Sequence, residues 1–272
     1  MYHTLLEMII PVVKTYPSEA GIYSINNGLQ VLGGYGFCSD FILQQYYRDI
    51  RISSIYEGTT GIQSQDLLGR KMMLNNGEGA KLLLDEIKKT IDEAMQYEDL
   101  KQWADSLSLQ LDQTQKILFH LIPFAAKGDY ERFLADASIF MEFFSLILIG
   151  WSWLEIGVTS KQALIISSNS DDSSFYKSKL DTLEYFYAYE LPKTKGLADI
   201  LLHPSSITIK KENKVIAHIA VLLTLVILIA LLGMRLPKSI DQGGLGLVRV
   251  LLMIGTSILS MVCFIDQLTY PY

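Results

Sequence analysis

Apolar residues return at intervals of three and four positions through most of this sequence, and this spacing limits what the chain can fold into. The alternation of apolar and polar residues that strands require does not persist in any segment. The sequence therefore predicts an all-α protein. With 272 residues, half of them hydrophobic, the chain is long enough for one large domain or two modest ones.

Breaks in the apolar pattern predict where the helices begin and end. The expected helices cover residues 1–15, 18–33, 40–47, 59–70, 80–97, 100–124 and 130–158. Pro11 is the expected kink of the first helix, and Ser18 is the expected N-cap of the second. The Asn75-Asn76-Gly77 run predicts a break, and Ser167 to Ser174 predict a loop.

One long apolar run lies in the middle of the chain, over residues 139–156. Two acidic residues, Glu142 and Glu155, interrupt it, and each charge inside a lipid bilayer would be costly. We therefore interpret this run as a core helix of the protein rather than a membrane span.

Two further apolar runs, residues 215–234 and 245–265, have the length that a bilayer requires. Their only charged residue is Arg249, near one end, where its side chain can reach the interface. These runs predict a transmembrane helical hairpin within residues 210–272. Basic residues lie on both sides of the first run, so its orientation cannot be predicted. Two helices buried in a soluble bundle are the alternative interpretation.

Charge and cysteine content exclude several classes of protein. The formal net charge is −6, and no segment gathers the lysine and arginine density that binding to nucleic acid requires. The two cysteines, Cys38 and Cys263, are far apart, and no cluster of cysteine and histidine indicates a metal site. We expect a reducing compartment. The start of the chain lacks a secretory signal pattern, so secretion is not predicted.

Three consecutive blocks carry the functional information, and they are Gln30–Phe37, Tyr47–Ile52 and Ile55–Gln63. The glycines of the first block permit close approach of the backbone to a ligand. In the third block, the carboxylate of Glu57 lies on a glycine-flanked turn ahead of a helix and can project into a cavity. Taken separately, each feature has a simpler explanation. The glycines could form a helix C-cap, and Glu57 could be a solvated surface residue.

In this order and spacing, the three blocks and the following Asp66–Lys71 segment resemble the acyl-CoA dehydrogenase family. The resemblance is strongest to a larger bacterial branch that has an extra C-terminal helical domain, and it extends more weakly to Ile209. It implies an incomplete C-terminal helical domain over residues 1–76 and an additional helical domain over residues 77–209. Residues 210–272 resemble nothing in the family.

The resemblance implies an FAD-dependent dehydrogenation of an acyl-CoA thioester. Glu57 would remove the α-proton of the substrate while the β-hydrogen leaves as hydride, and the backbone N–H of Glu57 would bind the thioester oxygen. Glu57 and Gly58 are thus the expected substrate-binding residues. The expected flavin contacts are Gln30, Val31, Leu32, Gly33, Gly34, Thr59 and Gly61. The first five would meet the flavin of a neighbouring subunit, which implies an oligomer.

Two further expectations follow from the resemblance. Arg48 and Asp49 match a residue pair of the family that we expect to form an ion pair. Family members also have an N-terminal helical domain and a β-domain, which supply most of the flavin and acyl pocket. We expect neither domain in this sequence.

Two functional hypotheses result. In the first, the chain is a piece of an acyl-CoA dehydrogenase, either a truncated gene product or a subunit that a complementary, separately encoded N-terminal polypeptide completes. In the second, it is a non-catalytic helical module, derived from that family and tethered to the membrane. In both, the helical domains are expected on the cytoplasmic side of the membrane. The sequence predicts neither the acyl chain length nor the electron acceptor.

Overall fold

The computed structural model describes residues 2–166, 170–203 and 207–209. The predicted membrane hairpin, with its runs 215–234 and 245–265, lies outside the described residues. The chain divides into two compact units, residues 1–205 and 206–272, and apart from one short helix, η8 (Ile207–Ile209), the described residues belong to the first. All regular secondary structure of the described residues is helical, as predicted. The domain boundaries after residues 76 and 209 stay predictions.

The described helices follow one another with short connections. The α-helices are α1 (Tyr2–Leu32), α2 (Leu43–Ile50), α3 (Thr60–Gln65), α4 (Glu78–Ala94), α5 (Lys101–Ala126), α6 (Tyr130–Leu134), α7 (Ala137–Ile166), α8 (Ser170–Tyr185) and α9 (Thr194–Leu201). Shorter 3-10 and π helices are η1 (Gly33–Phe37), η2 (Arg51–Ser54), η3 (Asp66–Lys71), η4 (Leu74–Gly77), η5 (Glu98–Leu100), η6 (Phe186–Glu190) and η7 (Leu191–Lys193).

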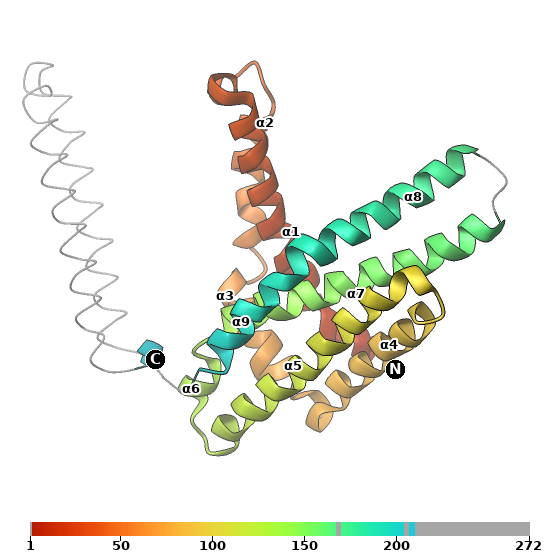
Figure 1. Cartoon of the computed structure of the whole chain (residues 1–272). Coiled ribbons are helices and arrows are strands. Elements are labelled where there is room, and N and C mark those ends of the chain that lie inside the picture. The colour runs from red at the N-terminus through yellow and green to blue at the C-terminus, as the bar shows by residue number, and fades with distance from the viewer. Residues whose placement is uncertain (1, 167–169, 204–206, 210–272) are drawn as a thin grey trace, which may run out of the picture. The chain divides into compact units, whose positions relative to one another are not determined.

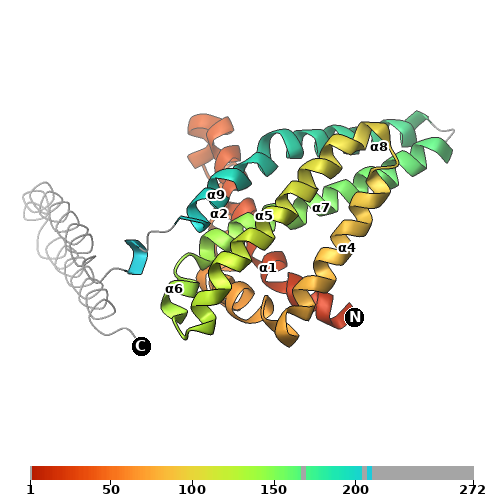
Figure 2. The ribbon, with the colours of Figure 1, turned by 60° about the horizontal axis from the view of Figure 1, so that its bottom comes forward.

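Helix α7 lies at the centre of the core. It contacts α3, α4, α5, α8 and α9, and Figures 1 and 2 show α8 running back beside the C-terminal part of α7. Phe140, Phe143 and Phe144 are buried, and the rings of Phe140 and Phe144 stack with their centroids 5.8 Å apart. Among the described residues α7 is the one helix long and apolar enough to cross a bilayer, and 61% of its most apolar window is buried. This agrees with the predicted core helix.

Specific contacts fix the helices that surround α7. The Tyr187 hydroxyl donates a hydrogen bond to the carbonyl oxygen of Gly150 (3.0 Å), and burial raises the pKa of this tyrosine. The indole N–H of Trp151 donates to the hydroxyl of Thr90 in α4 (2.8 Å). A Cβ atom at Gly157 would lie 2.5 Å from Leu183, so this glycine allows α8 to pack closely on α7. The core is thus both apolar and sterically specific.

Helix α1 differs from its prediction, because the structure has one helix of 31 residues where the sequence predicted two. Ser18 is therefore not an N-cap, and its hydroxyl donates instead to the carbonyl oxygen of Lys14 (2.6 Å). Pro11 and Pro17 lie inside the helix. Each proline removes one backbone donor, but buried neighbours such as Met8 supply tertiary packing that outweighs this loss.

Other helix boundaries also differ from the prediction. Helix α2 begins three residues later than expected, α7 is separated from α6 by a short turn, and α8 begins at Ser170, inside the predicted loop. The predicted break after η3 is confirmed, since Asn75 and Asn76 have φ angles of 50° and 57°. At the end of η3, the buried ammonium of Lys71 pairs with the carboxylate of Glu7 and so ties η3 to α1.

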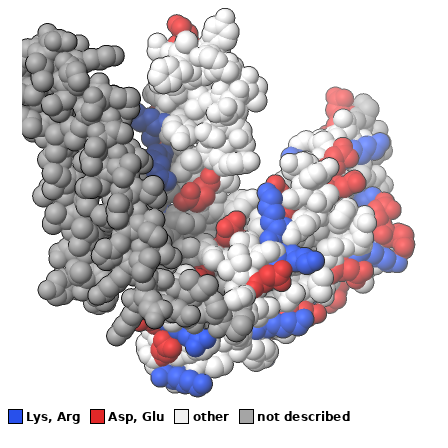
Figure 3. All heavy atoms as spheres, turned by 60° about the vertical axis from the view of Figure 1, so that its left-hand side comes forward, with Lys and Arg blue, Asp and Glu red and all other residues white. Residues whose placement is uncertain are grey.

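The second half of α1 and helix α2 form an outer hairpin (residues 19–50), which Figure 1 shows rising from the helices around α7. Gly21 and Gly28, one heptad apart, allow the two helices to approach, because their Cβ positions would lie 3.2 and 3.0 Å from Ile50 and Leu43. No apolar side chain of residues 13–66 is buried, although all of these residues are described. Charged atoms are sparse on the part of the hairpin visible in Figure 3. Large apolar side chains are exposed there, among them Tyr23, Val31, Tyr35, Phe37 and Ile42.

Candidate functional site

Glu57 lies on a tight turn between η2 and α3, which we call the Glu57 turn (residues 55–59). Both Glu57 and Gly58 have left-handed backbone conformations, with φ angles of 54° and 89°. Glycine adopts this region readily, whereas for a residue with a Cβ atom it costs roughly 1–2 kcal/mol. Thr59 returns to an extended conformation, and its hydroxyl accepts a hydrogen bond from the N–H of Ile62 (3.5 Å). The predicted start of a helix at this position is confirmed.

Two side chains bind the backbone of the Glu57 turn. The amide of Gln63, in α3, donates a hydrogen bond to the carbonyl oxygen of Glu57 (2.8 Å). The ammonium of Lys14, in α1, donates to the carbonyl oxygen of Gly58 (2.5 Å). The carbonyl groups on the two sides of Gly58 are therefore held by side chains from two different helices.

Two more links join α1 to the same region, one before the Glu57 turn and one after it. The hydroxyl of Ser18 donates to the carbonyl oxygen of Ser53 (3.2 Å), and the hydroxyl of Thr60 donates to the carboxylate of Glu19. Because Ser18 follows Lys14 by one helical turn, both side chains lie on one face of α1. That face positions the whole segment from η2 to α3.

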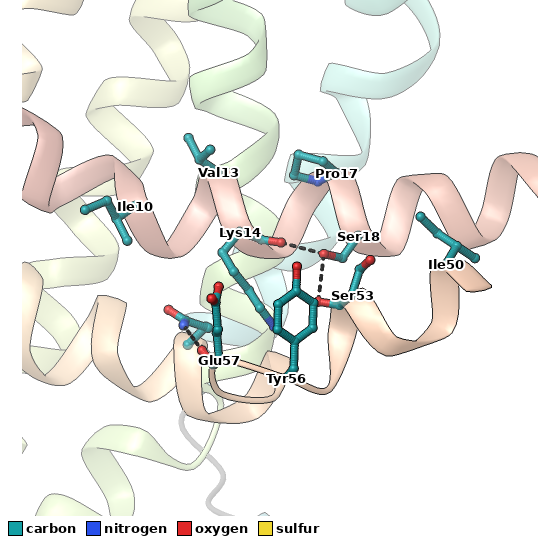
Figure 4. Close-up of a pocket in the computed structure, with 10 residues that line it drawn as sticks. Ile10, Val13, Lys14, Pro17, Ser18, Ile50, Ser53, Tyr56 and Glu57 are labelled. Atoms are coloured by element: carbon teal, nitrogen blue, oxygen red, sulfur yellow. Dashed lines mark hydrogen bonds between the residues drawn. The ribbon is translucent and has the colours of Figure 1, made fainter. Parts of the chain in front are cut away.

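An open cavity of about 640 Å³ lies between α1 and the Glu57 turn. Its lining residues are Ile10, Val13, Lys14, Pro17, Ser18, Ile50, Ser53, Tyr56, Glu57 and Gln63. Figure 4 shows the carboxylate of Glu57 pointing from the turn toward α1. No described residue forms an ion pair or a hydrogen bond with this carboxylate, and none accepts a hydrogen bond from the N–H of Glu57. Both groups are available to a ligand.

The predicted flavin contacts form two groups that the structure does not bring together. Thr59 and Gly61 lie beside Glu57, whereas Gln30, Val31, Leu32, Gly33 and Gly34 lie at the far end of the outer hairpin. From Lys14 to Gln30 the helical rise along α1 is about 24 Å. This separation fits the prediction that Gln30–Gly34 contact the flavin of a neighbouring subunit, which stays a prediction.

The open backbone at the glycines of these groups fits a ligand that approaches closely. Cβ atoms built at Gly33, Gly34 and Gly61 would have no heavy atom within 4 Å. The side chains of Gln30 and Val31 are exposed. None of the predicted contacts is a basic side chain, so they fit a flavin whose phosphates are bound elsewhere. No cluster of acidic, histidine or cysteine residues in the described part could hold a metal ion.

Sequence reasoning missed the residues that hold the Glu57 turn and was wrong about one pair. Gln63 belongs to the third sequence block, so its proximity to Glu57 could have been inferred. Lys14 precedes Gly58 by 44 positions, and no local signal connects them. The expected ion pair of Arg48 with Asp49 is wrong: both side chains are exposed on α2, and neither forms an ion pair within the described residues. Adjacent helical residues point in different directions.

Two family models match this chain. The model described as "Acyl-CoA dehydrogenase, C-terminal domain" matches residues 3–72, which include the outer hairpin and the Glu57 turn. The model described as "Acetyl-CoA dehydrogenase C-terminal like" matches residues 83–210. Together they cover nearly all described residues.

Several curated proteins are similar to the chain. A broad-specificity linear acyl-CoA dehydrogenase of Mycobacterium tuberculosis is 30% identical over 201 residues, which are 72% of this chain and 33% of that protein. A 3-methylmercaptopropionyl-CoA dehydrogenase of Ruegeria pomeroyi is 30% identical over 184 residues, 67% of this chain and 31% of that protein. A butyryl-CoA dehydrogenase of Syntrophomonas wolfei is 27% identical over 204 residues, 70% of this chain and 31% of that protein.

The chain spans about a third of the length of these relatives. Its matches to the family models and to the relatives agree with the order of the sequence blocks and with the helical fold. The chain belongs to the acyl-CoA dehydrogenase family.

Proposed function

We propose that this chain is the C-terminal helical part of an FAD-dependent acyl-CoA dehydrogenase and that Glu57 is its catalytic base. Other domains, on this or a separate polypeptide, would hold the flavin. The observation that carries the proposal is the Glu57 turn, where a carboxylate without a partner points toward an open cavity from a backbone conformation that glutamate rarely adopts. Unfavourable backbone conformations of this kind are concentrated at functional sites.

The chemistry of the proposed step requires both free groups of Glu57. The α-proton of a thioester is a weak acid, so its removal needs a base and stabilisation of the negative charge that develops on the thioester oxygen. The Glu57 carboxylate takes the α-proton, and the Glu57 N–H donates a hydrogen bond to the thioester oxygen. When bound, the flavin accepts the β-hydrogen as hydride.

The cavity favours an aliphatic acyl chain. Three of the α1 residues that line the cavity, Ile10, Val13 and Pro17, are apolar. Ligand pockets commonly combine an apolar wall with a few polar groups that set orientation. The relatives named for linear acyl-CoA and butyryl-CoA suggest straight-chain thioesters as the first substrates to test.

The exposed apolar side chains of the outer hairpin support the proposal that other protein surfaces complete the site. A cluster of exposed large apolar residues on a soluble domain usually marks an interaction surface. Here the cluster includes Val31, which is 87% exposed, and Phe37, which is 94% exposed. We propose that flavin-bearing domains, or a neighbouring subunit of a homo-oligomer, cover this surface and bring FAD to Gln30–Gly34, Thr59 and Gly61.

The test is reconstitution. The full chain would be co-expressed with the N-terminal and β-domains of the Mycobacterium tuberculosis relative, and reduction of an artificial electron acceptor would be followed with butyryl-CoA and longer straight-chain thioesters. Glu57→Gln should lower the rate by about 10²- to 10⁴-fold, the range for loss of a general base. Glu93→Gln, at an exposed position of α4, is the matched control and should leave it unchanged. An unchanged rate in Glu57→Gln would show that Glu57 is not the base.

The same co-expression experiment also tests the alternative function. If the co-expressed domains neither associate with the chain nor retain flavin, a non-catalytic module tethered to the membrane is favoured. The tether has its own test, since a protein with the predicted hairpin should stay in the membrane fraction after a carbonate wash. Release into the soluble fraction would contradict the membrane prediction.

A further inference from the structure

The conformation of the Glu57 turn is not one that its own residues favour. Glu57 and Gly58 are consecutive left-handed residues, and only the second is a glycine. A turn of this kind persists where the surrounding structure holds it. The residues that can maintain it are therefore those whose side chains donate hydrogen bonds to its two carbonyl groups.

The two bonds differ in kind. Gln63 is a neutral donor from α3, close in the sequence, and its partner is the carbonyl oxygen of Glu57. Lys14 is a charged donor from α1, and its hydrogen bond of 2.5 Å to the carbonyl oxygen of Gly58 belongs to the shorter and stronger class. Lys14 forms no ion pair with a described carboxylate, so this carbonyl oxygen is its partner in the described structure.

We propose that Lys14 is a positioning residue for Glu57, an inference that rests on the proposed function. Holding the carbonyl groups on both sides of Gly58 fixes the two peptide planes that follow Glu57. This restricts rotation of the backbone that carries the Glu57 carboxylate and N–H. A displacement of about 1 Å at a catalytic group can lower a rate by about 10²-fold. Because the ammonium binds a carbonyl oxygen, it does not neutralise the carboxylate that must act as a base.

Lys14 can be replaced without removing the other links between α1 and this region. The hydrogen bond from Ser18 to Ser53 and the one from Thr60 to Glu19 do not involve it. Lys14→Met should therefore fold, with a mobile Glu57 turn. Lys14→Arg keeps a charged donor and should restore the turn. Lys81→Met, at an exposed position of α4, is the matched control.

The first measurement needs no enzymatic activity. A glutamate-specific protease would be added to the full chain in mild detergent, and cleavage after Glu57 would be followed by mass spectrometry. Lys14→Met should be cleaved there about tenfold faster than the wild type, the ratio expected from the loss of one charged hydrogen bond. Lys14→Arg and Lys81→Met should remain near the wild-type rate. Equal cleavage of Lys14→Met and the wild type would overturn the inference.

The second measurement uses the reconstituted assembly with flavin-bearing domains. Lys14→Met should lower kcat by about 10²-fold, as for a misplaced catalytic group, while KM changes less than about twofold. Lys14→Arg should recover most of kcat. Full activity of Lys14→Met in an active assembly would overturn the positioning role. An inactive wild-type assembly would instead refute the proposed function, and the cleavage rates would still decide whether Lys14 holds the turn.

Discussion

The helices around α7 and the segment of residues 13–66 are stabilised in different ways. In the first region, large apolar side chains such as Phe133 and Phe140 are fully buried. In the second, the buried side chains are small and mostly polar, and hydrogen bonds from Lys14, Ser18 and Gln63 hold the backbone. The region that carries the candidate base therefore depends on polar links, and its large apolar side chains stay exposed.

The largest effect on stability is expected from loss of a buried apolar side chain in the helices around α7. Phe140→Ala should lower the free energy of unfolding by about 3–5 kcal/mol, because a fully buried ring in α7 would be replaced by a cavity. Phe37→Ala, in the outer hairpin, should change it by less than about 0.5 kcal/mol. Urea denaturation of the full chain in mild detergent, followed by circular dichroism, measures both. Similar losses would show that the two regions are stabilised alike.

A second pair of substitutions tests how closely the core is packed. Gly157→Ala should destabilise the protein by about 1–3 kcal/mol, because the new methyl group would lie 2.5 Å from buried Leu183. Gly196→Ala in α9 has open space around it and should instead stabilise by about 0.5–1 kcal/mol through helix propensity. The same denaturation measurement applies. A gain at Gly157 would mean that α8 can move away from α7.

Periodicity was sufficient to predict the helical class and the central core helix, because both depend on where apolar residues recur. It failed at α1, where Ser18 suggested the N-cap of a second helix although tertiary packing continues the first. It also failed at Ser170, because polar residues that are typical of loops here begin α8. Propensity is a local quantity, and these outcomes depend on packing between helices.

The candidate site likewise has parts that could be predicted from the sequence and parts that could not. Glu57, Gly58 and Thr59 form a contiguous block, so the turn and the start of α3 could be predicted from neighbouring residues. The contact of Lys14 with Gly58 could not, because it arises only when α1 packs against a segment 44 positions away. For Gln30–Gly34, the structure gives positions but no partner, and their predicted flavin contacts remain predictions.

A third pair makes the same substitution, glutamate to glycine, once in each of the two regions. Glu57→Gly should stabilise the protein by about 1 kcal/mol, because glycine adopts the left-handed conformation at this position without steric conflict. Glu155→Gly, at an exposed position inside α7, should destabilise by a similar amount through loss of helix propensity. Opposite signs in urea denaturation would show that the backbone is strained at Glu57 and not at this position of α7. A loss of stability at Glu57 would mean that its side chain stabilises the turn.

The smallest effect is expected at the base of the segment of residues 13–66, where Lys71 of η3, just after it, pairs with Glu7 of α1, just before it. The Lys71 ammonium holds the pKa of Glu7 below its ordinary value of 4.5. Because the folded pKa is the lower one, the contribution of Glu7 to stability is complete above about pH 4.5 and is lost as the pH falls through the folded pKa. Glu7 is about one-third exposed, so solvent screens the pair and limits the effect.

This pH dependence can be assigned with two variants. Glu7→Gln should lower the midpoint of thermal unfolding at pH 7 and should flatten its decline below pH 4.5, because no carboxylate remains to be protonated at this position. Asp99→Asn is the control: Lys161 also lowers the pKa of Asp99, but that carboxylate lies on the surface of the core region. If Glu7→Gln keeps the acid decline of the wild type, the link between α1 and η3 depends on buried apolar residues such as Met8 and Leu67 rather than on the ion pair.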